Sequence, residues 1–125
     1  MKLIDTTIAV DHLRGTGPAV ELTTGVVLAG EPLAASEVVR FELLAGVRPR
    51  ELDALEQFCS ALTWVAVNED VVRVAGALAR RYRRSHSAIG VADYLIAATA
   101  IVCDADLLTT NVRHFPMFAG LAPAY

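Results

Sequence analysis

The chain has 125 residues, enough for one domain with a single hydrophobic core and too few for two. Hydrophobic residues make up 54% of it, which excludes a disordered chain, and the net charge of −3 excludes a polycation that coats nucleic acid. No apolar stretch reaches the roughly 20 residues that a membrane span needs. Early acidic residues are atypical of a signal peptide. The two cysteines make neither a disulfide framework nor a four-cysteine zinc site, so we expect a cytoplasmic protein whose cysteines are reduced, small core residues.

Short apolar runs alternate with longer segments of helical character. The first half predicts, in order, a strand, two helices, a strand and a helix: 2–4, 5–14, 18–28, 33–35 and 36–45. The second half predicts a helix, a strand, two helices, a strand and a short helix: 49–62, 63–67, 68–84, 91–105, 107–109 and 111–115. These helix ranges include N-cap residues such as Ser36 and Asn68, and Gly15 and Gly46 mark helix ends.

This alternation predicts parallel strand pairing and an α/β fold, a three-layer α/β/α sandwich with a mostly parallel sheet. No repeat or long linker divides the chain, so we expect one domain over 1–125. In such sheets ligands bind beyond the carboxyl ends of the strands. The residues that follow the predicted strands are therefore the first candidates for a site.

Asp5 and the segment 109–111 each directly follow a predicted strand. Both segments also have a purely structural interpretation. Asp5 is a candidate helix N-cap, and the polar residues of the second segment, Thr109, Thr110 and Asn111, suit a turn followed by a helix cap. Both positions also lie at the carboxyl edge of a parallel sheet. Thr7 is placed to hold the Asp5 carboxylate or a metal-bound water.

Glu42 and Asp93 are acidic residues on otherwise apolar helix faces. At about 100° per residue, Glu42 lies opposite the mean direction of Glu37 and Arg40, toward the core. A buried salt bridge to an arginine is the alternative to a metal-binding or catalytic role there. Asp93 shares a small apolar face with Ile96, and its alternative is a helix cap.

Four segments thus bring Asp5, Glu42, Asp93 and Asn111 to one edge of the predicted sheet. Carboxylates gathered in this way repel one another, and Mg²⁺ or Mn²⁺ with oxygen ligands is the natural counter-charge. Such an ion supports phosphoryl chemistry, because it activates water and stabilises charge on phosphate oxygens. No phosphate-binding loop or nucleophile-elbow motif is present to suggest other chemistry.

Four stretches of the sequence resemble the VapC toxins, a family of PIN-domain ribonucleases. They are LIDTT at 3–7, ASEVVRFELLAG at 35–46, IGVADYLIAA at 89–98 and LLTTNVRHF at 107–115. They follow the family's order and span almost the whole chain. The resemblance implies a PIN-like fold and a Mg²⁺- or Mn²⁺-dependent endoribonuclease, the toxic half of a type II toxin–antitoxin pair.

By position, the resemblance implies that Asp5 and Asp93 are the principal metal ligands. The resemblance also implies that Glu42 is a metal ligand or a base that positions water. It further implies that Asn111 completes the pocket and that Thr7 and Thr109 support the site. The family often has Asp where this chain has Asn111, so we expect one tightly held metal. The resemblance also implies a homodimer and a VapB-type antitoxin whose tail inserts into the acidic pocket.

An RNA substrate needs positive charge near the site, because phosphate contacts dominate affinity. Arg113 is adjacent to Asn111, and Arg80 and Arg84 belong to an acid-free basic cluster, so these three arginines are the candidates. A solvated helix end that favours cations is the alternative for the cluster.

Two other α/β protein families that gather acidic residues at strand ends are each excluded by a single residue of this sequence. A haloacid-dehalogenase-type phosphatase needs a second Asp where this chain has Thr7, and a response-regulator receiver needs a late lysine, whereas Lys2 is the only lysine. The remaining alternative is a catalytically weak PIN-fold module that binds RNA or protein, since the amide of Asn111 binds a second cation less well than a carboxylate.

Overall fold

A computed structural model describes all residues 1–125 and contains one four-stranded sheet. Its strands are β1 (Lys2–Ile4), β2 (Leu33–Ser36), β3 (Thr63–Val65) and β4 (Asp106–Leu108). They lie in the order β3-β2-β1-β4 and all pair in parallel. β1 therefore has a neighbour on each side, and all four carboxyl ends lie at one edge, as the sequence predicts.

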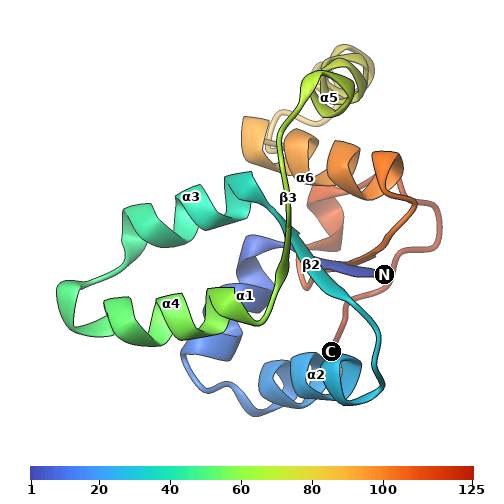
Figure 1. Ribbon diagram of the computed structural model, residues 1–125. Helices are drawn as coiled ribbons and strands as arrows, with labels where there is room; N and C mark the ends of the chain where they lie inside the picture. Colours follow the sequence, from blue (N-terminus) through green and yellow to red (C-terminus); the bar gives the residue numbers. More distant parts are fainter.

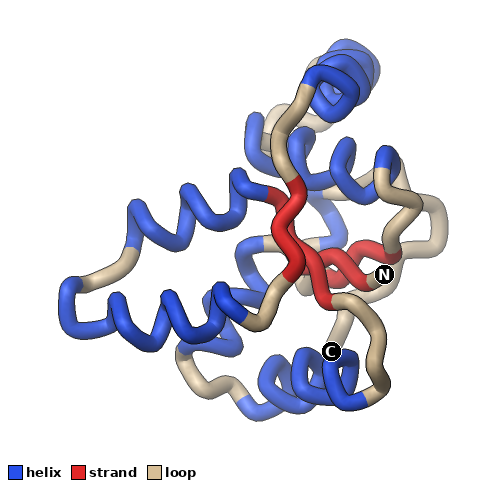
Figure 2. Tube along the Cα trace, viewed as in Figure 1, coloured by secondary structure: helices blue, strands red, loops and turns tan.

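Six α-helices and two 3₁₀ turns connect the strands. They are α1 (Thr6–Leu13), α2 (Gly17–Leu28), α3 (Glu37–Gly46), η1 (Pro49–Glu51), α4 (Leu52–Ser60), α5 (Glu69–Tyr82), α6 (Val91–Val102) and η2 (Val112–His114). Figure 1 shows α5 and α6 above the sheet and α2 below it, with α3 and α4 projecting to the left. The strands form the middle layer in Figure 2, which confirms the three-layer α/β/α prediction. No helix is long and apolar enough to cross a membrane.

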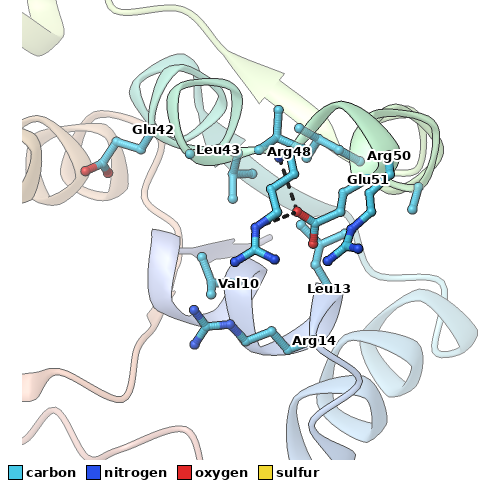
Figure 3. A pocket seen from close by; sticks show the side chains of 12 residues that line it. Val10, Leu13, Arg14, Glu42, Leu43, Arg48, Arg50 and Glu51 are labelled. Carbon is cyan, nitrogen blue, oxygen red and sulfur yellow. Dashed lines mark hydrogen bonds and ion pairs between the residues drawn. The ribbon is translucent and has the colours of Figure 1, made fainter.

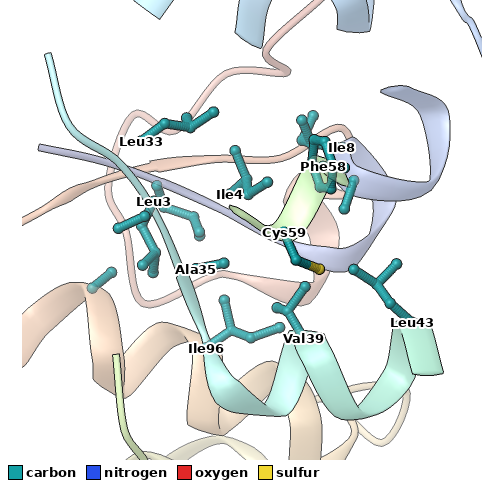
Figure 4. Close-up of a cluster of buried hydrophobic side chains, with 14 of the residues drawn as sticks. Leu3, Ile4, Ile8, Leu33, Ala35, Val39, Leu43, Phe58, Cys59 and Ile96 are labelled. Carbon is teal, nitrogen blue, oxygen red and sulfur yellow. The ribbon is translucent and has the colours of Figure 1, made fainter. Parts of the chain in front are cut away.

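The main core lies on both faces of the central strands (Figure 4). Every residue of β2 is buried, and the small side chains of Ala34 and Ala35 leave room for helices to pack against the sheet. Leu3 and Ile4 of β1 are fully buried, and Ile96 of α6 packs in the same cluster. Buried apolar area of this kind is the dominant stabilising contribution to a small domain. It fixes β1, and with it the first candidate residue after that strand.

Helix ends differ from the predicted ranges for local reasons. The predicted helix 91–105 stops at Val102, because Asp104 adopts a left-handed conformation with φ 49°. The amide of Ala105 then donates to the carbonyl of Ala100, and the amide of Asp104 to that of Ile101, which is the Schellman arrangement. The predicted helix 49–62 is instead divided into η1 and α4, and the strand predicted at 63–67 ends at residue 65.

Candidate active site

Asp5 follows β1 directly and is 3% exposed. Its Oδ1 accepts hydrogen bonds from the Thr7 hydroxyl at 2.6 Å and the amide of Ile8 at 3.2 Å, and Oδ2 accepts one from the Thr109 hydroxyl at 2.5 Å. The carboxylate is thus an N-cap of α1 and also the buried end of a cavity. Asp5 therefore fulfils both interpretations, as a helix N-cap and as a residue of the candidate site.

No basic side chain forms an ion pair with the Asp5 carboxylate. Burial raises the pKa of Asp5, and the hydrogen bonds from Thr109 and Thr7 offset part of that rise. A buried carboxylate without a positive partner lowers the stability of the folded chain. Because Asp5 is already desolvated, binding of a cation adds electrostatic attraction at little further desolvation cost to the carboxylate.

A cavity of about 710 Å³ lies at the carboxyl edge of the sheet. Four acidic side chains line it, from Asp5, Asp11, Glu42 and Asp93, together with Asn111. The structure therefore brings all four predicted site residues to one cavity, although they come from four separate segments. Arg14 and His114 also line this cavity.

Glu42 and Asp93 are each held by neighbouring groups. Glu42 Oε1 accepts a hydrogen bond from the Thr6 hydroxyl at 2.5 Å, and no arginine forms an ion pair with it. Asp93 Oδ2 accepts from the amide of Gly90 at 3.0 Å and lies 3.0 Å from His114 Nδ1. The buried salt bridge weighed for Glu42 is therefore wrong. The N-cap role weighed for Asp93 is also wrong, because Gly90 is the N-cap of α6 and Asp93, the third residue of the helix, accepts from its amide.

The segment after β4 closes the far side of the cavity. Thr109 is fully buried, and its hydroxyl accepts a hydrogen bond from the amide of Asn111 at 2.9 Å while it donates to Asp5. The Thr110 hydroxyl lies 3.3 Å from that of Thr7. The supporting positions predicted for residues 7 and 109 thus both contact Asp5 directly.

The donor atoms suit a hard divalent cation. The acidic side chains do not form a preassembled group of three or more ligands, but their oxygens face one cavity. Mg²⁺ binds through one or two carboxylates and keeps several waters, so a roomy oxygen-lined cavity fits it better than it fits zinc. Asp5, Asp93 and Asn111 fit the requirement for oxygen donors.

Three further residues at the cavity were not predicted from the sequence. Asp11 and Arg14 lie four and seven residues after Thr7 on α1, so helical spacing from Thr7 was the available signal. Asp11 Oδ2 accepts a hydrogen bond from the Tyr125 hydroxyl at 2.5 Å, which ties the chain's last residue to this helix. His114 reaches Asp93 only through the tertiary fold, and no sequence spacing signals that contact.

The arginines predicted to bind RNA lie outside this cavity. Arg113, Arg80 and Arg84 are exposed, and none lines the cavity. Their role in RNA binding stays a prediction.

The PIN domain family model matches residues 2–120. Ribonuclease VapC19 of Mycobacterium tuberculosis is 67% identical over the full length of both chains. The chain belongs to the VapC family of PIN-domain proteins. Ribonuclease VapC10 of the same organism is 42% identical over all of this chain and 93% of its own length. The resemblance seen in the four sequence stretches is thereby confirmed.

Solved structures with the same fold cover nearly the whole VapC-family chain. VapBC2 from Rickettsia felis, crystallised with a promoter DNA fragment, superposes with a TM-score of 0.82 over 98% of this chain and 96% of that one, at 23% identity. A toxin–antitoxin complex from Klebsiella pneumoniae gives 0.81 over 100% and 98%, also at 23% identity. This likeness confirms the fold class.

Proposed function

We propose that this chain is the toxic component of a type II toxin–antitoxin system and cleaves RNA phosphodiester bonds with Mg²⁺ or Mn²⁺. One observation carries the proposal: the buried Asp5 carboxylate, which no basic side chain pairs, shares a cavity with Glu42 and Asp93. Full-length identity of 67% to a protein named as a ribonuclease supports the same chemistry. We place its action in the cytoplasm, where RNA is available.

In this proposal Asp5 and Asp93 hold the divalent ion, and Asn111 completes the ligand set. When bound there, a divalent ion would supply water activation and stabilisation of negative charge on the phosphate. Glu42 lines the same cavity and would accept the proton of the attacking water. The Thr7 and Thr109 hydroxyls fix the orientation of Asp5, so that its oxygens need no rearrangement when the ion binds.

The partners proposed for the chain are a VapB-type antitoxin and a second copy of itself. An arginine of the antitoxin tail suits the four-acid cavity, because it supplies the missing positive charge and blocks RNA. Solved structures of the same fold include one named as a toxin–antitoxin complex and one named as VapBC2. In the proposed homodimer, the second copy covers Phe41 of α3, whose side chain is 69% exposed. F41S should shift the chain toward a monomer in light scattering.

Cleavage of a structured RNA with Mg²⁺ or Mn²⁺, and with a chelator, tests the activity. D93N should reduce cleavage at least about a hundredfold, because a metal ligand is removed. D53N removes an equal charge from the exposed surface of α4 and should leave cleavage unchanged. Cleavage retained by D93N, or undiminished by the chelator, would contradict the proposal. Absence of Mn²⁺ binding in calorimetry would favour the PIN-fold binding module instead.

A further inference from the structure

A second cleft, of about 590 Å³, adjoins the acidic cavity. It lies between α1, α3 and the connection from α3 to α4 (Figure 3). Val10, Arg14 and Glu42 line both hollows, so the two adjoin along a shared wall. We call the second hollow the arginine cleft.

Three arginines give the arginine cleft its charge. Arg14 comes from the end of α1, whereas Arg48 and Arg50 come from the connection to α4, and their side chains surround one opening (Figure 3). Arg14 and Arg50 form no ion pair, and Arg48 Nε is 4.0 Å from Glu51 Oε1. All three are exposed. The Arg14 and Arg50 guanidinium groups are thus unpaired, whereas Arg48 forms a long, exposed ion pair with Glu51 that an external anion can replace.

The position of Arg48 is set by its backbone. Its amide donates to Glu51 Oε1 at 3.2 Å, and Pro49 begins the 3₁₀ turn η1 with its fixed φ. The turn holds Arg48 and Arg50 on the same side of the cleft, as Figure 3 shows. The arginine cleft is therefore organised by local structure before any ligand arrives.

The two adjoining hollows differ in charge. The acidic cavity holds four carboxylates and suits a cation, whereas the neighbouring cleft has three arginines against two glutamates, Glu42 and Glu51, and so offers an excess of positive charge to an anion. An RNA strand needs both: one phosphate approaches the ion, and the phosphates beside it need positive groups. Guanidinium groups bind phosphate oxygens with paired hydrogen bonds.

We propose that Arg14, Arg48 and Arg50 bind the backbone phosphates of single-stranded RNA next to the phosphate that is cut. The inference rests on the proposed ribonuclease function of the adjoining cavity. No aromatic side chain lines the arginine cleft, so it contacts phosphates rather than stacked bases and contributes affinity without base preference. Arg14 lies in both hollows and binds the phosphate nearest the ion.

The test compares two triple variants with equal charge change. R14Q/R48Q/R50Q removes the arginine cleft's charges, and the control K2Q/R40Q/R73Q removes three charges that pair with acidic residues outside both hollows and outside the basic cluster around Arg80 and Arg84. Binding of a fluorescein-labelled unstructured RNA is followed by anisotropy over a KCl series, with chelator present so that no cleavage occurs.

The cleft variant should bind RNA at least about tenfold more weakly. Its plot of log affinity against log salt should be shallower by about 2, or roughly 0.7 for each single-strand phosphate that the variant no longer neutralises. The control should keep the wild-type slope. The single variant R48Q should show about one third of the slope change, which guards against misfolding of the triple variant. Equal losses of affinity in both triple variants, or no loss in the cleft variant, would overturn the proposal.

Two further measurements separate this inference from others. Weakened binding of an oligoglutamate peptide, with RNA binding intact, would make the cleft a protein-docking site and overturn the RNA assignment. Cleavage with Mg²⁺ is measured in parallel on the wild-type chain. Cleavage by the wild type with unchanged RNA binding by the cleft variant refutes the arginine assignment alone. Absence of wild-type cleavage refutes the proposed function, while the anisotropy comparison still decides whether the arginines bind RNA.

Discussion

Replacement of Thr109 by valine tests the support of the buried Asp5 carboxylate. The Thr109 side chain is fully buried, and its hydroxyl donates to Asp5 Oδ2 and accepts from the amide of Asn111. T109V keeps the shape but removes both bonds and leaves a buried carboxylate oxygen unpaired. Because hydrogen bonds to charged groups contribute about 1.5–3 kcal/mol and neutral ones about 1, we expect a loss of about 2–4 kcal/mol in the free energy of unfolding.

Thr99 provides a matched control in the same fold. It is also fully buried, but its hydroxyl donates only to the carbonyl of Leu95, which the helix already satisfies. T99V should therefore lower the free energy of unfolding by less than about 1 kcal/mol. In urea unfolding at neutral pH with chelator, T109V should lower the midpoint by about 1 M or more relative to T99V. Equal midpoints for the two variants would refute the argument that Thr109 sustains the Asp5 charge.

Three other changes probe the same site. D5N should raise the free energy of unfolding at pH 7 in chelator, because burial raises the pKa of Asp5 in the folded chain. The Asp5 carboxyl of the wild type binds its proton more tightly in the folded chain than in the unfolded one. The free energy of unfolding therefore falls as the pH rises from 3.8 through the raised pKa of Asp5. D5N should lack this fall when urea unfolding is compared at pH 4 and pH 7. H114A removes the Nδ1 contact that orients Asp93 and should weaken Mn²⁺ binding by about tenfold in calorimetry. Y125F removes the hydroxyl that anchors the last residue, so hydrogen exchange at the preceding backbone amide should accelerate.

Each of these predictions has an outcome that contradicts it. D5N less stable than the wild type at pH 7 would mean that the hydrogen bonds of Asp5 outweigh the burial of its charge. Unchanged Mn²⁺ affinity in H114A would separate the histidine from the metal site. Unchanged exchange in Y125F would show that the tail is held by its other contacts alone.

The sequence predicted the site because topology, rather than contact detail, brings its residues together. Asp5 and Asn111 follow strands, and parallel pairing of β1 with β4 places those strand ends side by side. Glu42 and Asp93 were predicted from the faces of their helices, and both line the same cavity. A prediction that needs only strand order and helix periodicity does not depend on side-chain rotamers.

What the sequence did not predict depends on tertiary contacts. The His114–Asp93 pair joins η2 to the first turn of α6, and the arginine cleft forms only when α1 lies opposite the α3–α4 connection. The end of α6 was also misplaced, because Asp104 adopts a left-handed conformation that Gly usually signals. Cys59 is a buried core residue, whereas Cys103 is only half-buried, so a core position for both cysteines is wrong for Cys103.

The pairing of β1 with β4 joins segments more than a hundred residues apart, and the hydrogen bond from Thr109 to Asp5 spans 104 positions. During synthesis, the ribosome must therefore release almost the entire polypeptide before Asp5 acquires its second hydroxyl partner. A translation product interrupted before residue 106 lacks the outer strand and the threonine that follows it. Such fragments lack one of the two hydroxyl groups that hold the Asp5 carboxylate, so the candidate site is completed only after nearly the whole polypeptide has been made.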